Sequence, residues 1–213
     1  MRRDCDTAVV ENRSVGSALK AELRRELLAA RRALPPEAAA AAAASLARRA
    51  LELPELADAG TVAAYVSVGT EPGTRELLDG LRRAGKRVLL PVLLPDNDLD
   101  WAAYEGPGSL AEAAHPGKMR LLEPAGPRLG PQAVTAADAV LLPGLAVDGR
   151  GMRLGRGGGS YDRVLERLER AGAHPALVVL LYDDEVVARV PEEPHDHPVQ
   201  AVATPSGVRR FSS

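Results

Sequence analysis

Residues 141–163 read LLPGLAVDGRGMRLGRGGGSYDR and join an apolar run to an amphipathic segment. The apolar run, Asp138 to Val147, is typical of a buried strand, and Ser160 to Ala171 predicts a helix. Glycines between them allow positive φ and a close approach to a ligand, while free N–H groups at a helix start bind phosphate oxygens. Three arginines of the loop would supply countercharge: Arg150, Arg153 and Arg156. The stretch predicts a strand, a phosphate-binding loop and a helix.

This loop departs from the two best-known phosphate-binding patterns. No lysine follows a glycine within it, as a P-loop requires. A dinucleotide-binding fingerprint that begins at Gly155 would need glycine where the chain has Ser160. A glycine-rich surface turn without a ligand is the alternative. The strand before the loop, the helix after it and the arginines within it favour phosphate binding.

Strands and helices alternate along the rest of the chain. Apolar residues spaced by three and four predict a helix from Leu19 to Leu34, which Pro35 and Pro36 end, and an alanine-rich helix follows. A further helix is predicted at 74–84 and strands at 61–68, 86–94, 98–104, 176–182 and 199–204, with 98–104 as an antiparallel partner of the strand before it. This alternation predicts an α/β fold with a mostly parallel sheet covered by helices.

Length and composition favour one globular domain. The 213 residues include 46% apolar and 26% charged residues, which is ordinary globular usage. Residues 1–17 are polar and predict a flexible N-terminal tail, and 18–213 predict a single domain without internal repeats. No apolar run approaches the roughly 18 residues that a membrane-spanning helix needs. We therefore expect no membrane partner.

Charge and cysteine content narrow the expected partners and location. The formal net charge is −2 and aromatic residues make up 3% of the chain, a combination that disfavours nucleic acid as a partner. The single cysteine, Cys5, has no partner for a disulfide, which favours a reducing compartment and predicts a cytoplasmic location. A small molecule is the expected ligand.

The residues from Leu142 to Arg163 closely resemble the signature of the 5-formyltetrahydrofolate cyclo-ligase family, also called methenyltetrahydrofolate synthetases. Other features of that family stand in order and extend the resemblance over roughly Leu19 to Val208: Lys20-Ala21-Glu22-Leu23-Arg24, Tyr65-Val66-Ser67 leading to Glu71, Leu90-Pro91, Glu123-Pro124, and Pro191 to Asp196. The resemblance implies a three-layer α/β/α sandwich of the Rossmann-like kind.

The resemblance also implies an activity. Enzymes of this family convert 5-formyltetrahydrofolate to 5,10-methenyltetrahydrofolate with cleavage of ATP to ADP and phosphate, and Mg²⁺ is the implied cofactor. The formyl oxygen is phosphorylated, and N10 then attacks the activated carbon. Folate and ATP are the implied partners, and the chain is expected to act as a monomer or a weak homodimer.

Site residues follow from the resemblance, position by position. Arg153 and Arg156 are the implied catalytic residues, because they would stabilise charge on the transferring phosphoryl group. Asp162 and Asp196 are the implied magnesium ligands. Substrate binding is implied for Val66, Glu71 and Tyr161. ATP binding is implied for Lys20, Ala21, Glu22, Leu23, Arg24, Arg153, Leu154, Gly155, Arg156, Gly157, Gly158, Gly159, Ser160 and Tyr161.

Several of these residues have simpler interpretations. Lys20 and Arg24, one helical turn apart, could merely solvate an exposed helix face. Trp101 and Tyr104 could stack on a pterin or belong to a hairpin core. Asp183-Asp184-Glu185 could be a metal cluster, although an acidic strand end facing water is the preferred interpretation. Zinc binding by His195-Asp196-His197 is disfavoured, since adjacent residues rarely converge on one tetrahedral metal. Glu123 has no role that the sequence indicates.

Two departures from the family pattern concern affinity. The family commonly has two tyrosines before the aspartate of the loop, where this chain has Ser160-Tyr161, and a glutamine after the late strand is replaced within Tyr182–Glu185. Two other functions remain open: a folate- or nucleotide-binding protein without turnover, and an enzyme of similar architecture that acts on sugar phosphates or CoA esters. Magnesium-dependent release of phosphate would separate the ligase from the second of these, and binding without turnover would identify the first.

Overall fold

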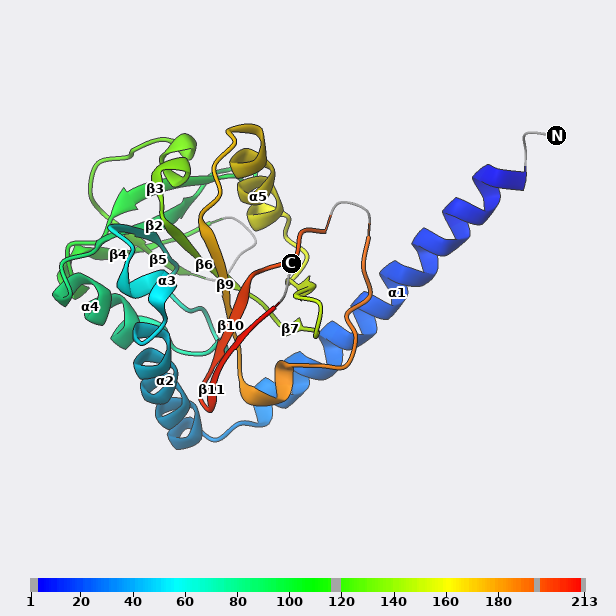
Figure 1. The fold of residues 1–213 in the computed structure, drawn as a ribbon, viewed down its shortest axis with the longest axis horizontal. Coiled ribbons are helices and arrows are strands. Elements are labelled where there is room, and N and C mark those ends of the chain that lie inside the picture. The colour runs from blue at the N-terminus through cyan, green and yellow to red at the C-terminus, as the bar shows by residue number, and fades with distance from the viewer. Residues whose placement is uncertain (1–3, 116–119, 194–195, 212–213) are drawn as a thin grey trace.

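The computed structural model describes residues 4–115, 120–193 and 196–211, with residues 4–15 as backbone alone (Figure 1). The helices are α1 (Asp4–Ala33), α2 (Pro36–Leu51), α3 (Pro54–Ala57), α4 (Arg75–Arg83) and α5 (Ser160–Arg170). Strands are β1 (Thr61–Ala63), β2 (Arg87–Leu93), β3 (Leu99–Ala103), β4 (Leu110–Ala113), β5 (Leu121–Pro124), β6 (Ala139–Pro143), β7 (Ala146–Val147), β8 (Arg153–Leu154), β9 (Ala176–Leu180), β10 (Ala201–Thr204) and β11 (Gly207–Arg210). Short 3-10 turns are η1 (Pro107–Ser109), η2 (Pro131–Ala136) and η3 (Asp183–Glu185).

Seven strands form the central sheet, in the order β11-β10-β9-β6-β1-β2-β3. The five inner strands pair in parallel, and the edge strands β3 and β11 pair antiparallel with their neighbours. The chain runs from β1 to β2 on one side and then returns to β6 on the other side of β1. The strand order therefore reverses between β1 and β6, which is where open α/β sheets bind ligands.

Alternate residues of each inner strand face opposite sides of the sheet, as the two-residue period of a strand requires. Val88 and Leu90 pack toward α2, α3 and α4, whereas Leu89 packs in the opposite cluster with α5 and η2. Both faces are therefore covered by helices, which explains why the inner strands are continuous apolar runs. The prediction of a mostly parallel α/β/α sandwich is confirmed.

The helix ends follow the local sequence. Pro36 occupies the first turn of α2, where its missing N–H costs no hydrogen bond. After α4, Gly85 takes φ +78°, the left-handed conformation that ends many helices. The boundaries predicted at these prolines and at Gly85 are confirmed.

Three predicted boundaries are wrong. The first helix begins at Asp4 and not at Leu19, so helical backbone extends into residues 1–17 and carries α1 away from the body of the protein in Figure 1. The predicted strand 61–68 ends at Ala63, and the predicted strand 138–147 divides into β6 and β7. Division into a tail and one domain stays a prediction.

Short elements escaped prediction because they lack a clear period. These are the β4–β5 hairpin, the β7–β8 hairpin and β11, each with strands of two to four residues. Among the described residues, no helix is both long and apolar enough to cross a lipid bilayer.

Candidate active site

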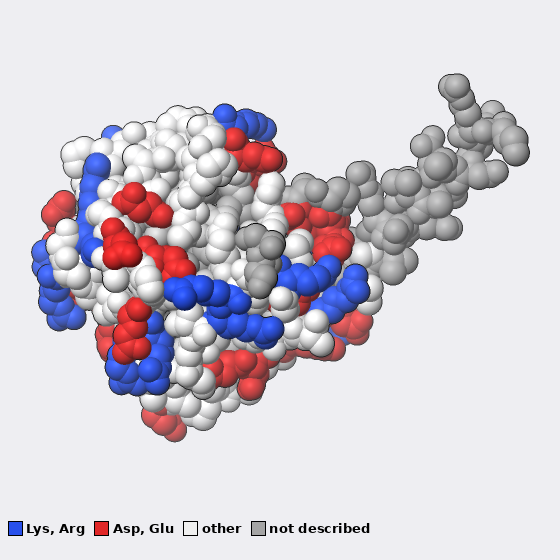
Figure 2. Space-filling view, viewed as in Figure 1, with Lys and Arg blue, Asp and Glu red and all other residues white. Residues whose placement is uncertain are grey.

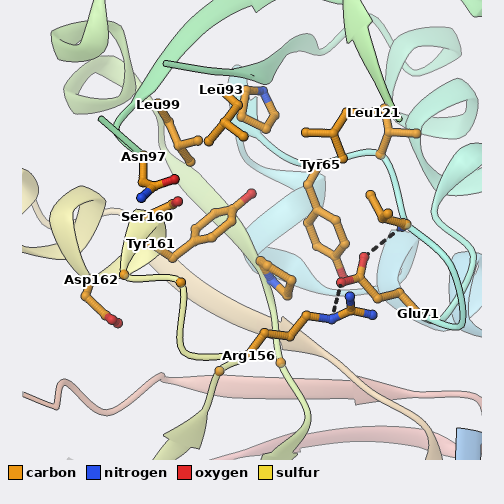
Figure 3. Close-up of a pocket in the computed structure, with 18 of the residues that line it drawn as sticks. Tyr65, Glu71, Leu93, Asn97, Leu99, Leu121, Arg156, Ser160, Tyr161 and Asp162 are labelled. Atoms are coloured by element: carbon orange, nitrogen blue, oxygen red, sulfur yellow. Dashed lines mark hydrogen bonds and ion pairs between the residues drawn. The ribbon is translucent and has the colours of Figure 1, made fainter. Parts of the chain in front are cut away.

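A pocket of about 570 Å³ opens at the carboxyl ends of β1, β2 and β6, beside the point where the strand order reverses (Figure 3). Tyr65, Val66 and Glu71 come from the segment after β1, and Leu93 ends β2. Pro143 ends β6, and Gly144 comes directly after it. The glycine loop and the start of α5 complete the wall. Loops at the ends of neighbouring parallel strands thus converge on one cavity.

The glycine loop contributes a continuous part of this wall. The residues of the loop that line the pocket are Gly155, Arg156, Gly157, Gly158, Gly159, Ser160, Tyr161 and Asp162. Gly157 and Gly159 have φ of +91° and +77°, so both positions use the left-handed conformation that glycine tolerates. Gly159 directly precedes α5, and the first three residues of that helix, whose N–H groups have no partner within the helix, line the same cavity. The geometry suits an anion at this end of the pocket.

Buried Asp148 holds the base of the loop. Its carboxylate accepts hydrogen bonds from the backbone N–H groups of Arg150, Met152 and Val190 and pairs with the Arg150 guanidinium at 2.7 Å. Burial alone would raise the pKa of Asp148, but these hydrogen bonds keep it below its usual range. Arg150 points at Asp148 and Glu192, outside the pocket. The prediction that Arg150 supplies countercharge to a ligand is wrong.

Arg153 is the buried cation of the pocket. Its guanidinium donates to the Pro143 carbonyl at 3.0 Å and to Asp162 at 3.3 Å, and only 7% of its side chain is exposed. Its Nε has no hydrogen-bond partner among the described residues. Burial lowers the pKa of Arg153, and Asp162 partly opposes this shift. A dehydrated guanidinium with a spare donor is suited to an anionic ligand.

Arg156 and Glu71 form an ion pair across the pocket, with Nε and Oε1 3.3 Å apart (Figure 3). The second Glu71 oxygen accepts from the Val68 N–H at 2.8 Å. Burial raises the pKa of Glu71, while the Val68 hydrogen bond and the Arg156 charge oppose this shift. In the protein without a ligand, the predicted folate-binding residue Glu71 is therefore paired with the predicted catalytic residue Arg156.

Lys20 and Arg24 reach the glycine loop from helix α1. Lys20 is 5% exposed and donates to Glu193 and Asp196, each at 2.7 Å. Arg24 donates from Nε to the Gly155 carbonyl at 2.9 Å. The interpretation that this pair merely solvates a helix face is wrong. Neither residue lines the pocket, but Arg24 contacts Gly155 in the pocket wall, and Lys20 contacts Glu193 and Asp196.

The other predicted ATP contacts of α1 lie differently. Ala21 and Glu22 are exposed. Leu23 packs beside buried Leu154 in a small apolar cluster under the loop. Their part in ATP binding stays a prediction.

The two predicted metal ligands are carboxylates with cationic neighbours. Asp162 lines the pocket and pairs with Arg153, and Asp196 pairs with Lys20. The Asp162 and Asp196 charges both oppose the lowering of the Arg153 pKa by burial. No group of three metal-binding side chains occurs within the described ranges, and His195 lies outside them. Two hard oxygen ligands fit an ion that takes its remaining ligands from phosphate and water.

Three further sequence interpretations are settled by packing. Trp101 is fully buried and Tyr104 is 4% exposed, both in hydrophobic clusters, so the core interpretation is confirmed and stacking on a ligand is not supported. The preferred interpretation of Asp183–Glu185, an acidic strand end facing water, is wrong for Glu185. This residue is 4% exposed and accepts a hydrogen bond from Arg31 at 2.6 Å.

Some pocket residues were missed from the sequence. Glu123, without an indicated role, lines the pocket, is 7% exposed, and accepts from the Leu93 N–H and the His115 ring. Apolar walls come from β2, β3 and β5 and include Leu93, Leu99, Leu121 and Leu122. Tyr65 also lines the pocket. Of these, only Tyr65 and Glu123 stand in motifs that could have identified them.

Comparisons with known proteins identify the family of this chain. The profile of the 5-formyltetrahydrofolate cyclo-ligase family matches residues 16–205. A 5-formyltetrahydrofolate cyclo-ligase of Mycolicibacterium smegmatis is 44% identical over 150 residues, covering 68% of this chain and 73% of that protein. The Escherichia coli K12 protein of the same name is 35% identical over 180 residues, covering 84% and 96%.

Solved structures give the same result. The 5,10-methenyltetrahydrofolate synthetase of Aquifex aeolicus superposes with a TM-score of 0.76 at 28% identity, covering 92% of this chain and 94% of that one. A Mycoplasma pneumoniae synthetase, at a TM-score of 0.65 and 18% identity, shares the fold. The residues matched by the family profile include the glycine loop, Glu71 and Lys20. The chain belongs to the 5-formyltetrahydrofolate cyclo-ligase family.

Proposed function

We propose that this protein converts 5-formyltetrahydrofolate to 5,10-methenyltetrahydrofolate, with cleavage of ATP to ADP and phosphate and with Mg²⁺ as cofactor. One observation carries the proposal. One pocket contains two kinds of wall. The glycine loop and Arg153 can bind an anion, and the rest of the wall consists mainly of apolar side chains together with the Glu71 carboxylate. Phosphoryl donor and folate can therefore meet in one cavity, as the transfer requires.

The folate end would bind the pterin ring through Glu71. A carboxylate accepts from both an amino group and a neighbouring ring N–H, and Glu71 keeps unused lone pairs beside its contacts with Val68 and Arg156. Val66 and the leucines of β2 and β3 would cover the ring. Tyr161, at the start of α5, also lines the pocket and would border the substrate.

The loop end would hold ATP. Backbone N–H groups of 155–160 would bind phosphate oxygens, and Lys20 and Arg24 would add positive charge from α1. Arg153 and Arg156 would stabilise the charge that develops as the γ-phosphoryl group moves to the formyl oxygen. Attack by N10 on the formyl carbon then closes the ring and expels that oxygen as phosphate.

Asp162 and Asp196 would hold magnesium. Asp162 lines the pocket, Asp196 pairs with Lys20 of α1, and magnesium is commonly held by one or two carboxylates together with substrate phosphates. Magnesium, when bound, supplies charge neutralisation for the phosphates. Asp162 would release Arg153, and Asp196 would release Lys20, so that each cation turns to ATP.

The partners and location complete the proposal. Folate and ATP are the proposed partners, without nucleic acid, and acidic and basic side chains are interspersed over the face shown in Figure 2. We also propose a cytoplasmic location and a monomer or weak homodimer. Gel filtration at micromolar concentration tests the oligomeric state.

Absorbance at the methenyl-folate band tests the activity. Purified protein is mixed with 5-formyltetrahydrofolate, MgCl₂ and ATP, and parallel samples omit ATP or magnesium. The expected result is a rise that needs both. Arg153→Ala should slow the rise by about 100-fold or more, as loss of a charge-stabilising donor does elsewhere. Arg163→Ala is the matched control, because Arg163 is half exposed on α5 and its ion pair is with exposed Asp96.

The outcomes separate the proposal from its rivals. Folate binding without any rise indicates a binding protein. A protein that binds neither folate nor ATP, or that acts on sugar phosphates or CoA esters without ATP, contradicts the proposal.

A further inference from the structure

The hydroxyl of Tyr65 is buried at the pocket without a hydrogen-bond partner. Tyr65 is 4% exposed, and its Oη neither donates to nor accepts from any described residue. The ring nevertheless lines the cavity, beside Glu71 and Tyr161 (Figure 3). The orphaned hydroxyl therefore belongs to a side chain of the pocket wall, and a ligand has to displace the groups that cover the oxygen to contact it.

Burial without a partner is costly for a hydroxyl. An unpaired buried polar group costs about 1–3 kcal/mol, and most native groups of this kind are paired. Tyr104 shows the usual arrangement in the same protein: it is equally buried, and its hydroxyl donates to Asp79 at 2.8 Å. A phenylalanine would fill the Tyr65 site without this cost. A hydrogen bond to a bound ligand would explain why a hydroxyl is present.

The surroundings keep this hydroxyl protonated. Burial raises the pKa of Tyr65 well above its usual value, and Glu71 and Tyr161 raise it further, whereas Arg31 lowers it. The Glu71 charge is therefore close enough to act on the phenol. At neutral pH Tyr65 offers one O–H donor next to a carboxylate that only accepts.

A pterin ring matches this order of groups. Along one edge it presents an amino group, a ring N–H and a carbonyl oxygen, in other words two donors followed by one acceptor. Glu71 can accept from both donors, and the carbonyl beside them then needs a donor from the protein. Among the described residues, two unpartnered hydroxyls line this pocket with Glu71, those of Tyr65 and Tyr161. We assign the donor to Tyr65, because it comes from the same segment after β1 as Glu71, whereas Tyr161 belongs to α5 at the phosphate-binding loop.

We propose that Tyr65 is a folate-binding residue whose hydroxyl donates to the pterin carbonyl next to the edge held by Glu71. The inference rests on the proposed function, because it takes 5-formyltetrahydrofolate as the ligand. Tyr65 would orient the ring within the pocket and would favour folates that carry a carbonyl, not an amino group, at this position.

The test pairs Tyr65→Phe with Tyr104→Phe in the full chain. Calorimetric titration with 5-formyltetrahydrofolate gives the folate Kd, and thermal unfolding without ligand gives Tm. In Tyr65→Phe, folate should bind roughly 2- to 10-fold more weakly, the loss of one neutral hydrogen bond, while Tm stays unchanged or rises. In Tyr104→Phe, folate affinity should stay unchanged while Tm falls by about 2–4 °C.

A merely structural hydroxyl would give the opposite pattern. If Tyr65→Phe lowers Tm as Tyr104→Phe does and leaves the folate Kd unchanged, the inference is overturned. A wild-type protein that does not bind 5-formyltetrahydrofolate contradicts the proposed function itself, whereas normal wild-type binding with an unaffected Tyr65→Phe contradicts only the role of Tyr65.

A second titration tests the atom that is contacted. A folate analogue with an amino group in place of the carbonyl should bind wild-type protein more weakly than the parent compound, and Tyr65→Phe should reduce this preference. Equal weakening of both compounds by the substitution would overturn the assignment to the carbonyl.

Discussion

The Lys20 ammonium lies 2.7 Å from the Asp196 carboxylate, so the predicted phosphate-binding lysine of α1 is bound to a predicted magnesium ligand. Burial alone would lower the pKa of Lys20, but hydrogen bonds from Lys20 to Asp196 and Glu193 raise it above its usual value. The lysine is therefore a cation at any physiological pH. A metal ion and this lysine would compete for the same oxygen atoms.

Replacement of Lys20 by glutamine should change metal binding and ATP binding in opposite directions. Without the lysine, Asp196 loses a competing cation, so Mg²⁺ alone should bind more tightly to Lys20→Gln than to wild-type protein. ATP should bind about 10-fold or more weakly, because a buried charge next to the loop is lost. Calorimetric titration with MgCl₂ alone and with ATP alone measures both effects.

Arg25→Gln serves as the control for Lys20→Gln. Arg25 lies on the same helix, its side chain is 72% exposed, and its ion pair is with exposed Glu22. Neither affinity should change in this variant. Weaker Mg²⁺ binding in Lys20→Gln would contradict the shared use of Asp196.

The raised pKa of Glu71 predicts how folate affinity depends on pH. Burial shifts this carboxyl above 4.5, so protonation begins at higher pH than in an ordinary glutamate. Donors of a bound pterin favour the ionised form and lower the pKa in the complex. Folate affinity should therefore rise with pH through the pKa of the free protein and fall below it. Titrations across pH 4.5–8 measure the profile.

Glu71→Gln identifies the group responsible for that profile. The variant should bind folate more weakly at neutral pH and should retain only the pH dependence of the ligand and of other groups. The stability of the ligand-free protein should depend on pH in the opposite direction. Because the pKa of Glu71 is raised in the folded state, ionisation of this carboxyl lowers the free energy of unfolding as pH rises through that pKa. An unchanged affinity profile in Glu71→Gln would refute the assignment.

Long periodic segments and one motif were predictable from sequence. The short apolar runs of β2, β6 and β9, the prolines before α2 and the glycine after α4 are local signals, so these elements could be placed from the sequence. The glycine loop was recognisable because its composition is unusual between a strand and a helix. Residues that share the pocket could then be expected together, since parallel strands end at one edge of a sheet.

Long-range pairs were not predictable. The partners of Arg31 and Arg150 are set by how α1 and the 183–193 segment pack on the sheet, and no local pattern encodes that. Arg150 stands in the loop like Arg153 and Arg156, yet it binds buried Asp148 below the loop. The orphaned Tyr65 hydroxyl likewise depends on what is missing around it in three dimensions.

The buried ion pair between Arg31 and Glu185 predicts a large loss of stability when one charge is removed. Nε and Oε1 are 2.6 Å apart, and the side chains are 1% and 5% exposed. Glu185→Ala should lower the free energy of unfolding by about 3–5 kcal/mol, because Arg31 is left buried without its partner. The double variant Arg31→Met/Glu185→Leu should lose less, since no charge remains. Denaturant unfolding measures both.

Glu55→Ala is the matched control for this pair. Glu55 binds Arg210 at a similar distance, 2.7 Å, but the arginine is 56% exposed. Its removal should cost at most about 1 kcal/mol. A cost for Glu185→Ala no larger than for Glu55→Ala would show that the Arg31 pair does not anchor α1.

Two glycines of the same loop should respond differently to a methyl group. Gly151 has φ +81°, and a Cβ there would lie 2.5 Å from the Val199 carbonyl oxygen, so Gly151→Ala combines backbone strain with a clash against main chain. We expect a loss of about 2 kcal/mol or more in the free energy of unfolding. Gly158 has ordinary φ, and a Cβ added there would meet no atom within 4 Å, so Gly158→Ala should leave stability unchanged or raise it by about 0.5 kcal/mol. Equal unfolding midpoints for the two variants would contradict this prediction. They would mean that the turn at Gly151 can change its conformation at little cost, and that the hydrogen bonds of Asp148 do not fix the loop.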